Sequence, residues 1–315
     1  RFLLKNIEQE VFLDAIKLYA DLATEISNLE LNKKNVEFLK EQLSLTKQQF
    51  EIGEVTLTDV SIAEARFSLS ESELLKTSND INSLSAKFLA LFGINPEEPE
   101  LNNELFQEKF DIIEAKELSK KKNPKIQNIV FQIKSSEKQI EGLKRKRLPS
   151  VKLEAEAKIN KGYFRSDSER EVLSAITRVD IPLYQSGSAS SKIREERKKL
   201  FALKELLNQH IKEVEYNLVS AISSYDYSFS RIGAYKKQIK SNKIFLEGLK
   251  QELLLGERTM LDLLDGEQEL LKSQLDLVRA KRDLFISFYE ILFYIGNLNA
   301  NYLSLEVDYF NDLEN

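Results

Sequence analysis

The stretch Gly256-Glu257-Arg258-Thr259-Met260-Leu261-Asp262 decides the fold that we expect, because an equivalent stretch occurs earlier in the chain. That stretch is Gly53-Glu54-Val55-Thr56-Leu57-Thr58-Asp59, and the two share Gly, Glu, Thr and Asp at the same positions. A repeat at a fixed offset indicates two copies of one structural unit. Glycine can end a helix with positive φ, and Thr-x-x-Asp matches a capping box that starts the next helix. We therefore predict a tight turn between two helices in each copy.

Both turns are flanked by segments in which an apolar residue recurs at every seventh position. In the first copy these residues are Leu29, Val36, Leu43, Phe50, Phe67, Leu74, Ile81 and Phe88. At the same offset the second copy has Ile232, Ile239, Leu246, Leu253, Leu270, Leu277, Leu284 and Ile291. A strict seven-residue apolar repeat keeps one seam on a partner helix, so it predicts long antiparallel coiled-coil helices.

Turn residues and changes of period divide the chain into six segments. We expect a first helical hairpin over 1–93, a connecting segment over 94–124, a helix over 125–147, a β-hairpin over 148–186, a second helical hairpin over 187–296 and a C-terminal segment over 297–315. Within the connecting segment a short helix is expected over about 106–118. The first copy is shorter before its turn than the second, so we expect the chain to be a fragment that lacks the start of copy one.

The β-hairpin is predicted from a change to period two. Residues 151–160 alternate between apolar side chains and the charged side chains of Lys152, Glu154, Glu156 and Lys158. A second alternating run extends from Val172 to about Tyr184, with Arg178 and Asp180 on its polar side and a polar loop over 161–171 before it. Strict alternation predicts strands with one apolar and one charged face.

Composition argues against several classes of function. The 315 residues include 46 Lys and Arg against 51 Asp and Glu, so no basic footprint for nucleic acid is present. Cysteine is absent, which removes disulfides and thiolate metal sites. The sequence shows no nucleophile–base set, metal cluster or phosphate-binding loop, and no apolar run of transmembrane-helix length. We therefore expect no enzyme, no metal site and no cofactor.

The order of these motifs resembles that of the TolC family of trimeric outer-membrane export ducts, over nearly the whole chain. Residues 256–269 resemble the family's second periplasmic tip, residues 147–151 the approach to its membrane strands, and residues 180–187 the exit from them. The resemblance implies a mainly α fold with a β-hairpin, in which the helices form an α-helical barrel and the strands join a trimeric transmembrane β-barrel. A strand with one apolar face can cross a bilayer only within a closed barrel.

The resemblance also implies function, partners and location. The protein would be a passive exit duct of a tripartite efflux pump or a type I secretion system, gated at its helical tips. It would be a homotrimer in the outer membrane of a Gram-negative cell, with its helical body in the periplasm. Its partners would be a periplasmic adaptor (membrane fusion protein), an inner-membrane transporter and outer-membrane lipid. A soluble coiled-coil scaffold or periplasmic adaptor without a pore is the alternative, although such a protein has no need of the hairpin between its heptads.

Several residues match functional positions of the family. The expected pore constriction is Asp262 and Asp265, and the expected gate links are Thr58, Asp59 and Arg258. The expected adaptor-docking tips are Gly53, Glu54, Val55, Gly256 and Glu257. The expected barrel lumen is lined by Lys152, Glu154, Glu156, Lys158, Arg178 and Asp180. Helix capping alone is the alternative role for Asp59 and Asp262, but it does not account for Asp265.

Overall fold

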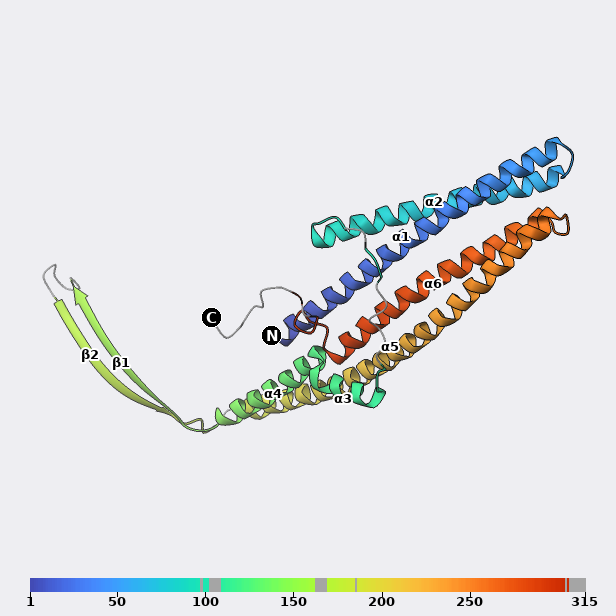
Figure 1. Cartoon of the computed structure of the whole chain (residues 1–315). Helices are drawn as coiled ribbons and strands as arrows, with labels where there is room; N and C mark the ends of the chain where they lie inside the picture. The colour runs from blue at the N-terminus through green and yellow to red at the C-terminus, as the bar shows by residue number, and fades with distance from the viewer. Residues whose placement is uncertain (97–98, 102–108, 162–168, 185, 304, 306–315) are drawn as a thin grey trace. The chain divides into compact units, whose positions relative to one another are not determined.

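The computed structural model describes residues 1–96, 99–101, 109–161, 169–184, 186–303 and 305. In chain order its elements are α1 (Phe2–Glu51), α2 (Leu57–Phe92), α3 (Ile112–Lys122), α4 (Pro124–Arg145), β1 (Ser150–Lys161), β2 (Glu169–Asp180), α5 (Ser188–Leu254) and α6 (Met260–Ile295) (Figure 1). The chain divides into two compact units: unit 1 is Arg1–Pro124 with Glu213–Asn315, and unit 2 is Lys125–Lys212. None of the described helices has both the length and the apolar character needed to cross a membrane.

The two predicted turns lie at the same end of unit 1, where α1 meets α2 and α5 meets α6 (Figure 1). Gly53 and Gly256 both have positive φ, at 79° and 77°. Thr56 and Thr259 then cap α2 and α6, and each forms a reciprocal capping box with the Asp three residues later. The capping satisfies backbone N–H groups that the first turn of a helix leaves free. The prediction from the repeat is confirmed at both tips.

Away from the tips, α3 packs against α6 and a hydrophobic core forms. Leu218 and Ile222 of α5, Leu284 and Ile291 of α6 and Ala115 of α3 are buried together. The predicted short helix is present, but it lies later in the chain than expected, because α3 begins at Ile112 and continues to Lys122. The carboxylate of Asp111 explains the start, since it accepts hydrogen bonds from the backbone N–H groups of Ile113 and Glu114. Residues 106–108 of the prediction lie outside the described residues.

Each returning helix ends at a glycine, at the last residue of its predicted hairpin, but the two ends differ in their surroundings. Gly93 and Gly296 both have left-handed backbone, with φ of 71° and 90°. A Cβ at Gly93 would meet nothing within 4 Å, whereas one at Gly296 would lie 2.5 Å from the carbonyl oxygen of Lys122. The side chain of Asn123 also donates to the carbonyl oxygen of Tyr294, at 3.0 Å. The end of α6 is therefore fixed against the residues that follow α3.

The apolar seam predicted for the first hairpin is only partly correct. Leu43 is buried, but Leu29 and Val36 are half-buried and Phe50 is exposed. The most buried positions of α1 in this region include Asn28, Asn32, Asn35 and Thr46. Asn28, Asn32 and Asn35 are four and three residues apart, which places them on one helix face, beside the face that the heptad pattern selected. The first hairpin therefore buries polar side chains together with Leu39 and Leu43, and Thr46 is buried where the second copy has Leu249.

In unit 2, β1 and β2 form an antiparallel two-stranded sheet. Val151 is paired with Val179 and Ala155 with Ala175, so apolar residues face apolar residues across the strands. The predicted end of the second strand at Tyr184 was wrong, because β2 stops at Asp180. Pro182 explains this, since proline has no N–H for the ladder. The predicted loop over 161–171 lies mostly outside the described residues, and β2 already begins at Glu169.

Candidate functional site

The second tip holds Asp262 in a capping box. Its carboxylate accepts hydrogen bonds from the backbone N–H and the hydroxyl of Thr259, at 3.0 and 2.8 Å. These bonds, together with the charge of Arg258, lower the pKa of Asp262 below its ordinary value. Arg258 itself donates to Glu252 of the same tip, at 2.9 Å. Within one chain, Asp262 is therefore a helix cap that stays ionised.

The first tip repeats this capping arrangement. Asp59 accepts from the backbone N–H and hydroxyl of Thr56, at 2.9 and 2.7 Å, and these bonds lower its pKa. Thr58 is exposed on the first turn of α2. We expected Arg258 in the tip contacts with Asp59, but within one chain the structure pairs Arg258 with Glu252 instead.

Both tips present a mixed polar and apolar surface. Gly53, Glu54, Gly256 and Glu257 are exposed and Val55 is half-buried. Bulky apolar side chains beside them are also exposed, namely Ile52, Leu57, Leu254 and Leu255, at 71, 64, 87 and 75%. Both tips therefore leave bulky apolar side chains uncovered within the single chain.

Asp265, the second expected constriction residue, contacts a residue that sequence reasoning missed. The guanidinium of Arg66 on α2 donates to the Asp265 carboxylate on α6, at 2.9 Å. Arg66 corresponds in the repeat to Glu269, so the repeat pattern contained no signal for this pair. The contact brings the first and second hairpins together close to their tips.

The β-hairpin has the faces that the alternation predicted. Glu154, Glu156, Lys158, Arg178 and Asp180 share the polar face with Lys152, according to the strand register. Arg178 lies within 3.5 Å of Glu154, diagonally across the strands. On the opposite face the apolar side chains are bare, with Leu153, Leu173 and Val179 exposed by 76, 86 and 55%.

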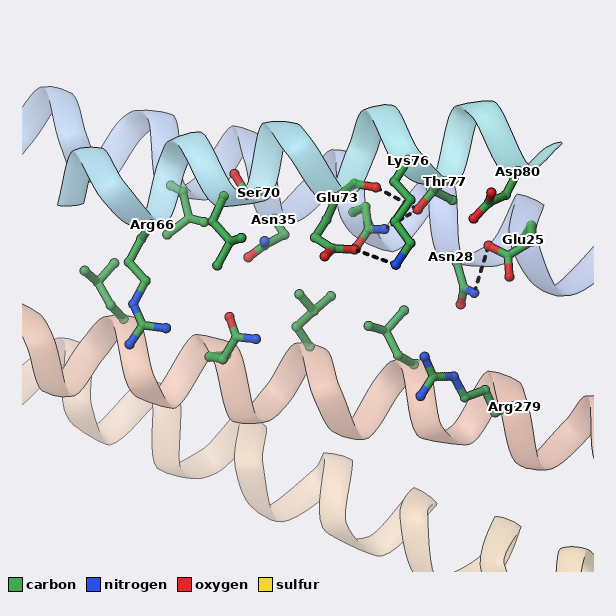
Figure 2. Close-up of a pocket in the computed structure, with 17 residues that line it drawn as sticks. Glu25, Asn28, Asn35, Arg66, Ser70, Glu73, Lys76, Thr77, Asp80 and Arg279 are labelled. Atoms are coloured by element: carbon green, nitrogen blue, oxygen red, sulfur yellow. Dashed lines mark hydrogen bonds and ion pairs between the residues drawn. The ribbon is translucent and has the colours of Figure 1, made fainter. Parts of the chain in front are cut away.

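A polar cavity lies between the first hairpin and α6 in unit 1. Its volume is about 300 Å³, and its lining includes amide, hydroxyl and charged side chains from α1, α2 and α6 (Figure 2). Asn32 donates to the hydroxyl of Thr77 at 2.9 Å. The buried Oδ1 atom of Asn28 accepts no hydrogen bond among the described residues. The cavity has the size and polarity to hold several water molecules, one of which would satisfy Asn28.

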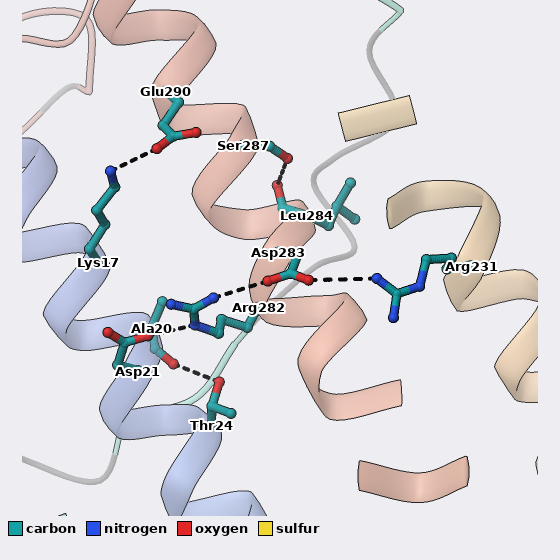
Figure 3. Close-up of polar contacts among 10 residues, drawn as sticks. All are labelled: Lys17, Ala20, Asp21, Thr24, Arg231, Arg282, Asp283, Leu284, Ser287 and Glu290. Carbon is teal, nitrogen blue, oxygen red and sulfur yellow. Dashed lines mark hydrogen bonds and ion pairs between the residues drawn. The ribbon is translucent and has the colours of Figure 1, made fainter. Parts of the chain in front are cut away.

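Farther from the tips, an ion-pair network joins three helices of unit 1 (Figure 3). Arg282 of α6 contacts Asp21 of α1 at 2.5 Å and Asp283 at 3.0 Å, and Asp283 lies 3.7 Å from Arg231 of α5. Lys17 of α1 pairs with Glu290 of α6 at 2.7 Å. Because Arg282 is half-buried, salt screens the charges of this network less than those of a surface ion pair. The network holds α1 against α6 in this part of unit 1.

Comparison with known proteins gives a consistent result. The family model described as "Outer membrane efflux protein" matches residues 117–297, which include the β-hairpin and the whole second helical hairpin. The solved structure of the outer-membrane channel OprN superimposes with a TM-score of 0.80 at 17% identity, covering 94% of this chain and 68% of that one. This likeness concerns the fold.

Two curated relatives extend the similarity to almost the whole chain. The outer membrane efflux protein BepC of Brucella suis is 24% identical over 96% of this chain and 67% of its own length. The outer membrane protein TolC of Escherichia coli is 24% identical over 93% of this chain and 62% of its own length. The chain therefore spans about two thirds of the length of these relatives.

Proposed function

The chain belongs to the outer membrane efflux protein family, and on that premise we propose that the full-length protein is a passive exit duct in the outer membrane. It would serve a tripartite efflux pump or a type I secretion system and would be gated at its helical tips. Its helical body would lie in the periplasm. Members of this family are channels rather than enzymes, so the proposal assigns no catalytic residues.

The observation that carries the proposal is the bare apolar face of the β-hairpin. Two strands alone leave both edges and the apolar side chains without partners, and such a sheet is not stable in water. In a bilayer every backbone group must be satisfied within the protein, which requires a closed barrel. We propose that three copies supply the strands, with the face containing Glu154 and Arg178 toward a water-filled lumen. The polar set for this lumen is Lys152, Glu154, Glu156, Lys158, Arg178 and Asp180.

At the other end, we propose that the tips form the gate and the docking surface. Trimerisation would place Asp262 and Asp265 around one axis, where their charge would favour cations. Thr58, Asp59 and Arg258 would contribute to links between tips in the closed state. A periplasmic adaptor, carrying an inner-membrane transporter, would dock against Gly53, Glu54, Val55, Gly256 and Glu257. Exposed Leu254 and Leu255 support docking, because they leave a large apolar area uncovered.

The test is assembly of the full-length protein in the outer membrane. Cell fractionation should place it there, with heat-modifiable gel mobility as the sign of a barrel, and ultracentrifugation in detergent should give a trimer. Leu153→Arg should cost up to about 2–4 kcal/mol near the bilayer midplane and should reduce assembly. Glu154→Arg is the matched control on the adjacent position, and its effect should be mild because that side meets water.

Equal loss of assembly with both variants would contradict the assigned strand faces. A stable monomer that remains in the soluble fraction would favour the alternative, a coiled-coil scaffold or adaptor without a pore.

A further inference from the structure

Near the tips, the first and second hairpins are joined through an exposed ion pair. The side chains of Arg66 and Asp265 are 35 and 58% exposed, and their N–O distance is 2.9 Å. Arg66 lies nine residues after the start of α2, about 13 Å along the helix. α2 and α6 make few contacts with each other over their whole lengths. Relative movement of the two hairpins at their tips would therefore lengthen or break this pair before contacts farther along the helices change.

The pair also changes the charge of the proposed constriction. Asp262 and Asp265 lie three residues apart, so one helix face presents both. The cap bonds of Asp262 come from neutral donors, and its carboxylate keeps its charge. Asp265 in contrast is bonded to a guanidinium, whose charge compensates its own. The two carboxylates are therefore electrostatically unequal.

Farther from the tips, other contacts in unit 1 hold α1 and α6 together, so the Arg66–Asp265 contact can open while these remain. The pairs of Arg282 with Asp21 and of Lys17 with Glu290 hold α1 to α6 farther from the tips (Figure 3). The polar cavity lies between these pairs and the tips, and its lining combines polar and charged side chains with five leucines from α1, α2 and α6 (Figure 2). A hydrated interface costs less to separate than a packed apolar one, because its polar groups can be resolvated.

We propose that Arg66 is a latch and a selectivity residue: its ion pair with Asp265 holds the two hairpins of one protomer together at the tip and removes Asp265 from the cation-attracting ring. This inference rests on the proposed function as a gated duct. While the latch is closed, Asp262, which forms no ion pair of its own among the described residues and has only the charge of Arg258 nearby, supplies most of the negative charge of the ring. When it opens, Asp265 is released into the ring as the hairpins separate, so opening and cation preference rise together.

The test uses the trimeric full-length protein in planar lipid bilayers, with potassium chloride gradients as the probe of selectivity. Arg66→Ala and Asp265→Ala should both raise conductance of the closed state. An exposed pair shifts an equilibrium by up to about fivefold, and three copies together by up to about a hundredfold. Cation selectivity should change in opposite directions, rising in Arg66→Ala, which frees Asp265, and falling in Asp265→Ala. The charge swap Arg66→Asp with Asp265→Arg should return closed-state conductance toward the parent value.

A matched control is Lys47→Ala, which removes an exposed ion pair with Glu64 inside the first hairpin and should leave both readouts unchanged. The 315 residues contain no cysteine, so Arg66→Cys with Asp265→Cys introduces one cysteine pair among them. A short bis-maleimide, which can span the distance that the Arg66 side chain covered, should cross-link this pair within one protomer and lower conductance.

The two single variants distinguish the latch from a purely structural contact. Equal selectivity in the parent and Arg66→Ala, or a charge swap that opens the channel as much as either single variant, would overturn the latch. A parent protein that forms no channel at all would instead refute the proposed function.

Discussion

The two helical hairpins of unit 1 share one plan but bury different side chains along their seams. In the first hairpin Thr46 is fully buried, and its hydroxyl donates to the carbonyl oxygen of Gln42 in its own helix. The equivalent residue of the second hairpin is Leu249, which packs with Leu246, Leu263 and Leu270. At this position the second hairpin therefore packs a leucine in an apolar cluster, whereas the first buries a threonine whose hydroxyl is satisfied within its own helix.

This difference shows that two copies of a repeat can share the residues of their turns and still bury different residues between their helices. The capping boxes are nearly identical in geometry at Thr56 and Thr259. The seams differ because burial depends on the neighbours of each hairpin, and α1 must contact both α2 and α6.

Leu249→Ala should destabilise the protein much more than Thr46→Ala at the equivalent position. Truncating a buried leucine costs about 2–5 kcal/mol, because a cavity is left in addition to the lost transfer energy. Thr46→Ala removes a methyl group and a hydroxyl that bonds only to its own helix, for about 1 kcal/mol. Thermal unfolding of the detergent-solubilised protein measures both, and equal costs would mean that the seams do not differ in packing.

Gly296→Ala should cost more than Gly93→Ala, although both glycines end equivalent helices. Alanine at either position bears roughly 1–2 kcal/mol of left-handed backbone strain. At Gly296 the new Cβ would also meet the carbonyl oxygen of Lys122, adding about 1–3 kcal/mol. The unfolding midpoints of the two variants give the comparison, which fails if Gly93→Ala proves the more damaging.

Thr56→Ala and Thr259→Ala should have equal effects, because the two caps are built alike. Loss of an N-cap hydroxyl costs about 1 kcal/mol. The measurement is again the unfolding midpoint of each variant, with Thr58→Ala as the exposed control on the same helix turn. A large difference between the two caps would show that one tip is held by contacts other than its capping box.

Acid should weaken both tips over the same range of pH. The pKa values of Asp59 and Asp262 are lowered in the folded protein, from an ordinary value of 3.8, chiefly by hydrogen bonds from Thr56 and Thr259. A carboxyl group whose pKa is lowered by folding contributes to stability at pH values above its unfolded-state pKa. That contribution is lost as the pH falls through its folded-state pKa. The thermal unfolding midpoint should therefore decrease as the pH is lowered below about 3.8. The double variant Asp59→Asn with Asp262→Asn should show a smaller decrease over this range of pH.

Much of the candidate site followed from local patterns, but its pairings did not. The spacing of Thr259 and Asp262 predicted the capping box, because a cap involves residues within one helix turn. The partners of Arg258 and Asp265 were not predictable in this way. Arg66 lies far from Asp265 in the sequence, and its repeat partner Glu269 has the opposite charge.

The sequence by itself determined the repeat, the positions of both turns and the alternation of the strands. These properties depend on neighbours along the chain and on the periods of helix and strand, which are the same in every fold. Only the tertiary structure decided that Asn28 and Asn32 are buried, that Gly296 approaches the backbone of Lys122 and that Arg66 meets Asp265. Each of these depends on how packed helices are rotated and how closely they approach, and many rotations are compatible with one heptad pattern.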